Sequence, residues 1–341
     1  MKRLISVFIY VGLIVFVLVA VNLYRSLFKP VKAGEEGIEI VIPRDSEYED
    51  VKDILSSVNL MVNEKSFDLL SKRKKYPGNI KPGRYIISDE MSYNDILNLL
   101  RAGNQTPVKL TFNNIRTLAD LASRISVQLA IDSTGILSFL ENEKNYSADG
   151  FTRATIMAVF LPDTYEMYWT ATAEDIYARM LKEFNDFWNS DRLSKARAIG
   201  LSPVEVSTLA SIVDDEVLME DEKPKIAGVY LNRLKINMPL QACPTIKFAL
   251  NDFTIRRVLN EHLTVDSPYN TYMYRGLPPG PVQCATKSGI NAVLNAEDHD
   301  FLYFVARYDF SGYHHFSQTL SEHNAYARKY QSELNSRRIY N

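Results

Sequence analysis

Cysteine is scarce in this chain: Cys243 and Cys284 are the two among 341 residues. Two cysteines are too few for a disulfide framework, and their spacing is not that of a metal site. The chain also lacks an excess of charge, since 39 Lys and Arg residues nearly balance 41 Asp and Glu residues. A net charge of −2 gives no general electrostatic reason to bind nucleic acid, so we expect no nucleic-acid partner.

Several recurring motifs are missing as well. No glycine-rich phosphate loop precedes a helix, and no internal repeat or low-complexity tract occurs. The histidines form no HExxH arrangement, so we predict neither a catalytic metal nor another cofactor. What remains is an ordinary globular composition, 46% hydrophobic, in a chain long enough for two domains with their own cores.

One long apolar run is present, at residues 4–24, and it contains no charged residue. A helix of that length is about 32 Å long, enough to cross the hydrocarbon core of a bilayer. We therefore predict an uncleaved transmembrane helix, because the alternative of a cleaved signal peptide lacks a clear small-x-small cleavage site. Basic residues occur on both sides of the run, so charge alone leaves its orientation undecided.

A linker at residues 25–36 leads into a small module at residues 37–105. The local signals are strands at 37–43 and 81–87, a capping box at Ser46 and Glu49, and a helix from Ser92 that stops at Gly103. Strands and short helices in this order predict an α+β module.

Residues 106–341 form a larger α+β domain in this interpretation. It opens with a strand at 108–112 and continues with helices rich in Leu, Ile and Ala. An aromatic stretch within it contains Tyr165 and Trp169. Aromatic faces stack on sugar rings, but such clusters more often belong to a core, and both interpretations stay open.

The most informative segment runs from Ser202 to Val217. Ser202 as N-cap, Pro203 at the first helical position and Glu205 three residues after the cap mark the start of a helix. Glu216 projects into the apolar face of that helix, inside an arc roughly 140° wide. Burial disfavours an ionised carboxylate, so Glu216 would suit general acid catalysis near neutral pH. The alternative is a core Glu that is paired with an Arg or Lys.

Separate motifs follow in a fixed order from this helix onward. They are LASIVDDEV (209–217), AGVYLNRLKINMPLQACPT (227–245), SPYNTYMYRGLPPGPV (267–282), FLYFVA (301–306), HHFSQTL (314–320) and HN (323–324). Together they resemble the YceG-like or MltG family of endolytic murein transglycosylases. Several motifs in the right order are a far more specific signal than any single motif. Weaker similarity extends upstream to about Ile38, so the resemblance covers nearly the whole chain beyond the apolar run.

The resemblance implies that Glu216 is the catalytic acid and base of a lytic transglycosylase. Such an enzyme cuts the MurNAc–GlcNAc bond within nascent glycan strands of peptidoglycan, leaves a 1,6-anhydro-MurNAc end and acts in termination of glycan elongation. One carboxyl group serves both steps, whereas hydrolases usually place two across the bond. The family commonly has Glu at the position of Asp214 as well, but Asp214 projects off the apolar face, so we assign the acid to Glu216.

The same resemblance implies where the protein works. Residues 1–3 would lie in the cytoplasm, the apolar helix in the inner membrane and the catalytic body in the periplasm, where the glycan strands are. Wall synthases (penicillin-binding proteins) are the implied protein partners. Residues 37–105 look like a LysM-like subdomain, which implies glycan contact; a spacer without affinity is the alternative.

Polar residues in the matching motifs are expected to line a groove around Glu216. We assign substrate binding to Gln241, Thr245, Tyr269, Asn270, Tyr272 and His314. His314 and His315 alternate on a strand pattern, so only one faces the groove, and the family position favours His314. Structural support is an equally good interpretation for any single one of them.

The chain departs from the family pattern at Asp214, at Cys243, where Asp is usual, and at Ala285 and Thr286, where a Pro-Gly pair is usual. Because Cys243 and Cys284 both lie inside family motifs, the resemblance makes them candidates for a disulfide in an oxidising periplasm.

Two other functions stay open on the sequence alone. Asp163, Asp214 or Glu220 could complete a carboxylate pair and make the protein a hydrolase, which adds water across the bond. The departures also leave room for a scaffold that binds the wall without cutting it.

Overall fold

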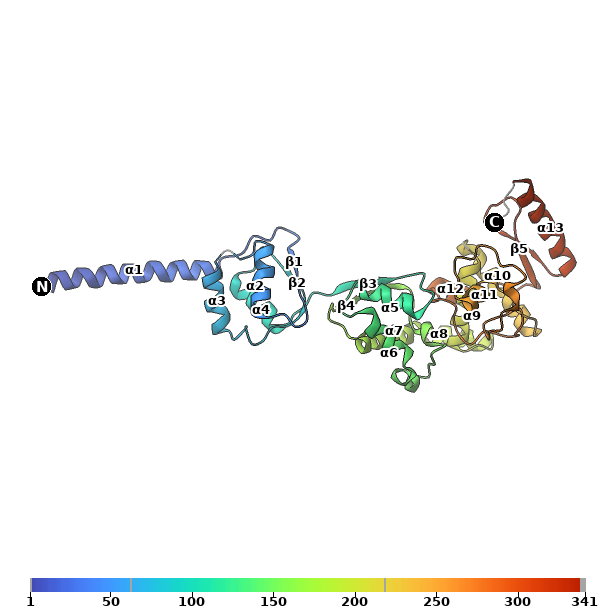
Figure 1. The fold of residues 1–341 in the computed structure, drawn as a ribbon, viewed down its shortest axis with the longest axis horizontal. Helices are drawn as coiled ribbons and strands as arrows, with labels where there is room; N and C mark the ends of the chain where they lie inside the picture. The colour runs from blue at the N-terminus through green and yellow to red at the C-terminus, as the bar shows by residue number, and fades with distance from the viewer. Residues whose placement is uncertain (1, 62, 218, 338–341) are drawn as a thin grey trace. The chain divides into compact units, whose positions relative to one another are not determined.

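The computed structural model describes residues 2–61, 63–217 and 219–337. The chain folds as two compact units (Figure 1). The first contains the residues up to Leu110 with the segments Val127–Ile131 and Tyr165–Thr172, and the second contains the remainder. Helices and small sheets are mixed along the chain, so the predicted α+β class is confirmed.

The first unit consists of a long helix followed by a small α+β module. Its elements are α1 Lys2–Phe28, β1 Ile38–Ile42, α2 Tyr48–Ser57, α3 Glu64–Arg73, β2 Gly83–Ile87 and α4 Tyr93–Ala102. β1 and β2 pair in antiparallel fashion, with Ile40 opposite Tyr85. Both of these side chains are buried in one cluster with residues of α2, α3 and α4, which closes the core of the module.

Helix α2 begins one residue later than predicted. Its N-cap is Glu47, and Asp50 completes the capping box in place of the predicted pair Ser46 and Glu49. The Asp50 carboxylate accepts the Glu47 backbone N–H at 2.7 Å, so a pair of acids serves the purpose that the sequence pattern assigned to Ser and Glu. Helix α4, in contrast, starts at its Ser92 cap as predicted.

Helix α1 presents apolar side chains to its surroundings. The large ones from Phe8 to Val19 are each at least 49% exposed. Within the described ranges, no helix combines the length and the hydropathy that a membrane crossing requires. The transmembrane helix predicted at 4–24 is therefore not confirmed.

The second unit carries most of the helices. Its elements are α5 Leu118–Ser126, α6 Ser133–Glu141, α7 Ala173–Phe187, α8 Ser190–Ala198, α9 Pro203–Glu216, α10 Lys223–Lys235, α11 Cys243–Leu250, α12 Lys287–Leu294, β5 Tyr303–Ala306, β6 His314–Ser317 and α13 Leu320–Ser336. β3 Val108–Phe112 pairs with β4 Asp163–Met167, and the division between the two units falls within this pair. β3 has the bounds predicted for it.

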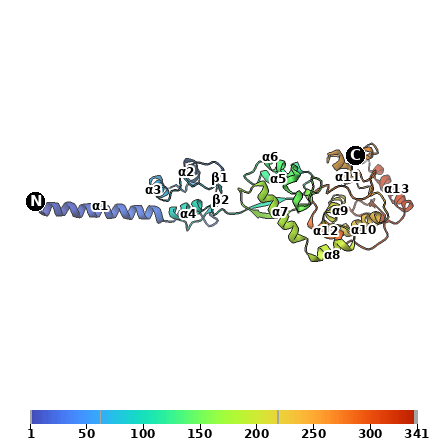
Figure 2. The same cartoon turned by 90° about the horizontal axis from the view of Figure 1, so that it is seen from below.

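Helix α9 lies among α10, α11 and α12, and its contacts with α10 and α12 can be followed in both views (Figure 1 and Figure 2). It starts as predicted, with a capping box of Ser202 and Glu205. The sequence predicts one apolar face, but Ser207, Thr208 and Ser211 are buried too. Their hydroxyls donate to backbone carbonyls of the preceding turn at 2.9, 2.9 and 2.7 Å, which satisfies them inside the core.

Candidate active site

Three successive carboxylates end helix α9: Asp214, Asp215 and Glu216. Successive side chains on a helix project about 100° apart, so each of the three reaches a different neighbour. Asp214 meets α10 and α12, Asp215 meets the residues before α5, and Glu216 meets α10 and α11.

Asp214 is held in a buried ion pair. Its carboxylate lies 2.8 Å from Lys223 Nζ, and these side chains are 5% and 6% exposed. The backbone N–H of Thr286, the N-cap of α12, donates to it at 2.8 Å, and the Thr286 hydroxyl donates at 2.9 Å. A methyl group on Gly289 would collide with the same carboxylate. Asp214 therefore anchors α12 to α9 through Lys223 and Thr286.

Asp215 is neutralised by an arginine from a distant part of the chain. The Arg116 guanidinium donates to both of its carboxylate oxygens, at 2.5 and 3.1 Å. The same guanidinium lies over the Phe253 ring, 5.1 Å from its centre. This bidentate ion pair fixes the end of α9 and occupies both oxygens of the Asp215 carboxylate.

Glu216 differs from both, because among the described residues no cation lies within ion-pair distance of it. The Tyr230 hydroxyl donates to its Oε1 at 3.2 Å, and the Cys243 backbone N–H also donates to it. Burial raises the pKa of Glu216 to about 7, and the Asp215 charge adds to the rise. The two hydrogen bonds and the charge of Lys247 oppose it. The residue as a whole is nevertheless partly exposed. Near neutral pH this carboxyl can therefore both donate and accept a proton.

Two tyrosines and a thiol surround this carboxyl. The Tyr272 hydroxyl lies 3.4 Å from Cys243 Sγ. Burial raises the pKa of Cys243, and the charge of Glu216 raises it further. Burial also raises the pKa of Tyr230 and of Tyr272 well above the ordinary value. Because all three stay neutral at physiological pH, Glu216 is the member of this cluster that titrates near neutrality.

Cys243 and Cys284 are both free thiols, so the candidate disulfide is not formed. Cys243 starts α11 beside Tyr272, whereas Cys284 is buried ahead of α12 and its backbone N–H donates to the Ile115 carbonyl at 2.8 Å. The fold places the two cysteines against different neighbours.

The loop before α11 and the first turn of that helix carry two of the residues assigned to substrate binding, Gln241 and Thr245. Gln241 is exposed, has a φ of 51°, and its backbone N–H donates to the Thr271 carbonyl at 3.0 Å. Thr245 is 0% exposed, and its hydroxyl bonds the Thr271 hydroxyl and the Ala242 carbonyl, both at 2.8 Å. Gln241 is thus accessible to a ligand, whereas Thr245 supports the loop.

A second loop carries the next three assigned residues. Asn270 is 0% exposed, and its side-chain amide donates to two backbone carbonyls at 2.8 and 2.9 Å. Its Oδ1 accepts the Tyr272 backbone N–H at 3.0 Å, so it holds the loop in shape. Tyr269 is half-buried and packs against Phe248, with ring centres 4.6 Å apart. Tyr269 and Tyr272 therefore reach the surroundings of α11 from a loop that Asn270 shapes.

His314 lies on β6 and pairs with Glu222, a residue that the sequence analysis does not single out. Its Nδ1 lies 2.8 Å from Glu222 Oε2, and its backbone N–H donates to Oε1 of the same carboxylate at 3.0 Å. His315 instead stacks on Tyr326, with ring centres 4.2 Å apart. The two histidines thus point to opposite faces, as predicted.

One aromatic ring connects His314 to the acid's hydrogen-bond donor. The Phe304 ring meets His314 edge-to-face at 5.5 Å and meets Tyr230 edge-to-face at 5.8 Å. Since Tyr230 donates to Glu216, two residues, Phe304 and Tyr230, lie between His314 and the carboxyl.

The carboxylates considered as partners of a hydrolytic pair are all engaged. Asp163 lies 2.5 Å from Lys287 Nζ and Glu220 lies 2.6 Å from Lys223 Nζ, which Asp214 also contacts. The hydrogen bond with Lys287 lowers the pKa of Asp163. Across the described part of the chain, no group of three or more His, Cys, Asp and Glu side chains is placed to hold a metal ion.

The two aromatic residues considered for sugar contact belong to the first unit. Tyr165 is 3% exposed and therefore packed in a core, whereas Trp169 is half-buried. Sequence reasoning also misses Arg116, which is 99 residues from its partner Asp215, and Lys223, which reaches Asp214 from the following α-helix. No helix or strand spacing links either pair.

Of the three carboxylates that end α9, Glu216 alone has no ion-pair partner among the described residues and has a pKa raised to about 7. The model of the YceG-like family matches residues 40–329, and the chain belongs to that family.

Named relatives and a solved structure agree with this membership. The endolytic murein transglycosylase of Bacillus subtilis (strain 168) is 30% identical over 330 residues, which are 92% of this chain and 90% of that protein. The endolytic murein transglycosylase of Streptococcus pneumoniae D39 is 28% identical over 79% of this chain and 54% of its own length. A crystal structure of a YceG-like protein from Listeria monocytogenes has a TM-score of 0.58 at 28% identity, covering 86% of this chain and 99% of that one.

Proposed function

We propose that this protein is a lytic transglycosylase of murein that cuts glycan strands internally, between MurNAc and GlcNAc, and leaves a 1,6-anhydro-MurNAc end. Glu216 is the observation that carries the proposal: its carboxyl has a pKa of about 7, accepts a hydrogen bond from Tyr230 and has no ion-pair partner among the described residues. The relatives named endolytic murein transglycosylase support the reaction class and the substrate.

The reaction needs one group that gives a proton and then takes one. Protonated Glu216 donates its proton to the oxygen that bridges MurNAc C1 and GlcNAc C4, and the bond from C1 to that oxygen breaks. The Glu216 carboxylate then accepts the proton of the MurNAc 6-hydroxyl as that oxygen bonds to C1. Glu216 ends protonated, as it began, and no water is consumed.

Neighbouring residues have supporting roles in this proposal. Between the two steps the Tyr230 hydroxyl and the Cys243 backbone N–H stabilise the ionised carboxylate. Gln241, Tyr269 and Tyr272 are accessible enough to contact the strand. Thr245, Asn270 and His314 act by holding the loops and the hairpin that surround the acid.

Product analysis tests the proposal. Full-length protein is incubated with uncross-linked peptidoglycan, and the fragments are identified by mass spectrometry beside those of Glu216→Gln. We expect internal fragments with anhydro ends, one water lighter than hydrolysis products, and none from the variant. Glu205→Gln, at the other end of the same helix, is the control.

Two results would replace the proposal with an alternative. Reducing ends would identify a hydrolase and require one of the ion-paired carboxylates to be released. Binding without cleavage by the folded wild-type protein would identify a wall-binding scaffold.

We further infer that α1 attaches the protein to the inner membrane, with the body in the periplasm beside the wall synthases. Exposed apolar side chains along α1 support an apolar partner for this helix. Flotation of the full-length chain with lipid vesicles tests this: recovery with the vesicles is expected, and recovery in the lipid-free fraction contradicts it. Crosslinking in cells followed by identification of penicillin-binding proteins tests the synthase partners.

Glycan contact by the module at residues 37–105 is also part of the proposal. A folded module that sediments with purified wall material would support it, whereas one that stays in solution would make the module a spacer.

A further inference from the structure

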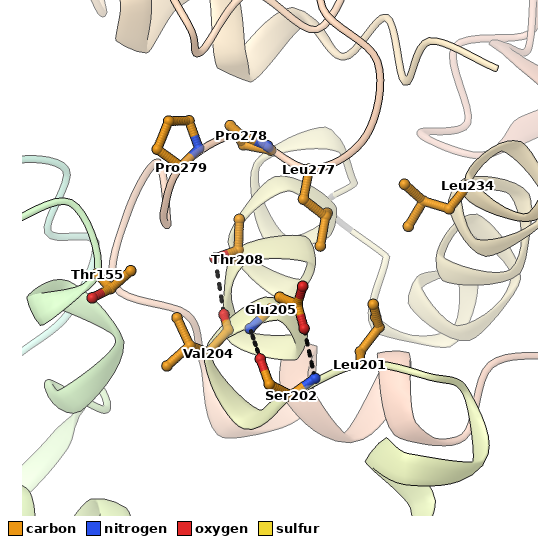
Figure 3. Close-up of a pocket in the computed structure, with 10 residues that line it drawn as sticks. All are labelled: Thr155, Leu201, Ser202, Val204, Glu205, Thr208, Leu234, Leu277, Pro278 and Pro279. Carbon is orange, nitrogen blue, oxygen red and sulfur yellow. Dashed lines mark hydrogen bonds between the residues drawn. The ribbon is translucent and has the colours of Figure 1, made fainter. Parts of the chain in front are cut away.

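Two pockets of similar size lie in the second unit and differ in their chemistry. The first, which we name the Pro278 pocket, measures about 540 Å³ and lies at the start of α9 (Figure 3). Its walls are largely apolar, with Leu277, Pro278 and Pro279 opposite the first turn of the helix. The Glu205 carboxylate there already accepts the Ser202 backbone N–H at 2.8 Å. No cationic side chain lines this pocket among the described residues.

The second, which we name the Arg153 pocket, measures about 490 Å³ and is lined by both charges and aromatic rings. Arg153 and Glu141 supply the charges, Phe248 and Tyr269 the rings, and apolar side chains complete the walls. Burial raises the pKa of Tyr269, and the nearby charge of Arg153 acts against that rise.

Helix α11 connects this pocket to the acid. Its first residue, Cys243, donates a backbone N–H to Glu216, and Phe248, five residues later, lines the pocket. Five residues of α-helix correspond to about 7.5 Å along its axis. The pocket therefore lies close enough to the acid for one substrate to occupy both.

The backbone at Arg153 is fixed by its neighbours, whereas its guanidinium group is accessible. The Thr152 backbone N–H donates to the Thr155 hydroxyl at 2.8 Å, which closes the turn around Arg153. A side chain at Gly280 would collide with the Ala154 carbonyl, so the two backbones are in close contact there. The guanidinium itself is on a side chain that is 62% exposed.

The present partner of Arg153 can be exchanged for a ligand. Glu141 lies 3.3 Å from the guanidinium and its side chain is 50% exposed. Exposed ion pairs of this kind hold their members weakly, so a ligand carboxylate can take the place of Glu141. The Glu141 carboxylate can then pair with an amine of the ligand. The aromatic rings can pack against small apolar side chains of the ligand.

We propose that the Arg153 pocket binds the peptide that branches from MurNAc in the glycan strand, with Arg153 holding a carboxylate of that peptide. This inference rests on the proposed function, since it names a second part of the same substrate. A branch that combines carboxylates, an amine and small apolar side chains matches a pocket of guanidinium, carboxylate and aromatic rings. Arg153 would thus set a preference for strands that carry their peptides.

The test compares two substrates that differ only in the peptide. Uncross-linked strands are used intact or after an amidase has removed the peptides, and kcat and KM are measured with the full-length protein. We expect the wild type to prefer intact strands about tenfold in kcat/KM, mostly through KM, as for one charged hydrogen bond. Arg153→Ala should cut intact strands only as well as the wild type cuts stripped ones, and Arg153→Lys should recover part of the preference.

Arg197→Ala is the matched control, because Arg197 is an exposed arginine outside the pocket, on α8. It should keep the preference for intact strands. Equal cleavage of both substrates by the wild type, with anhydro products, overturns the inference and leaves the proposed function standing. An unchanged preference in Arg153→Ala overturns it as well, and thermal unfolding shows whether that variant is folded. Absence of anhydro products from either substrate would instead overturn the proposed function.

Discussion

The two ends of helix α9 differ in how their polar and charged groups are satisfied. At the start, Ser202 and Glu205 bond each other's backbone N–H groups, and every partner lies within four residues. At the end, Arg116, 99 residues away, pairs with Asp215, and Lys223 on the next α-helix pairs with Asp214. Glu216 receives hydrogen bonds, and no cation among the described residues lies within ion-pair distance of it. The first end is satisfied by local hydrogen bonds, whereas the second holds one carboxyl at a pKa of about 7.

The largest expected effect comes from removing the acid at the second end. Glu216→Gln should lower kcat by about 10³, within the range of general acid–base catalysis, because amide nitrogen cannot deliver the proton. Rates of anhydro-product formation measure this. A variant that keeps more than a tenth of wild-type activity would contradict the assignment.

The same variant should be more stable than the wild type at alkaline pH. The folded pKa of about 7 lies above the ordinary value of 4.5, so the folded state holds the proton more tightly than the unfolded state. Wild-type stability therefore falls as pH rises from about 4.5 through 7, and the variant escapes that loss. Urea unfolding at pH 5 and pH 8 should show the gain at pH 8 and little at pH 5.

The next effect concerns stability at the anchored carboxylate. Asp214→Ala should destabilise the fold by about 3 kcal/mol or more, because it leaves Lys223 buried without its main partner. Urea unfolding measures the loss. The double variant Asp214→Leu with Lys223→Met is the control, and it should recover most of the stability.

A smaller effect is expected at the hydrogen bond to the acid. Tyr230→Phe should raise the pKa of Glu216, because the hydroxyl now stabilises the ionised form. The limb of the pH–rate profile that reports this group should move to higher pH, by up to about one unit. Tyr272→Phe, which removes a hydroxyl bonded to Cys243 instead, should leave that limb nearly in place.

The smallest effect belongs to the start of the helix. Ser202→Ala should cost about 1 kcal/mol of stability through the lost cap and should not move the pH–rate profile. A shifted profile would mean that the two ends of α9 are coupled.

Sequence reasoning succeeds where the interactions are short in range. The α9 cap, the limits of β3 and the place of Glu216 all follow from patterns within a few residues. It fails at α2, where two acidic residues form the capping box in place of the expected Ser and Glu. It also fails on the polar side of α9, which is buried because its hydroxyls donate to backbone carbonyls of the same helix. The partners Arg116 and Lys223 follow from tertiary folding, so no local pattern predicts them.

The contact of Asp214 with Thr286 also constrains how this site can change over evolution. A longer Glu at 214 would have to displace the Thr286 hydroxyl or the Lys223 ammonium, and Gly289 leaves no lateral room. Exchanging Thr286 alone would remove one donor from a buried carboxylate. We therefore expect the two positions to be epistatic, so that the effect of exchanging one depends on which residue occupies the other.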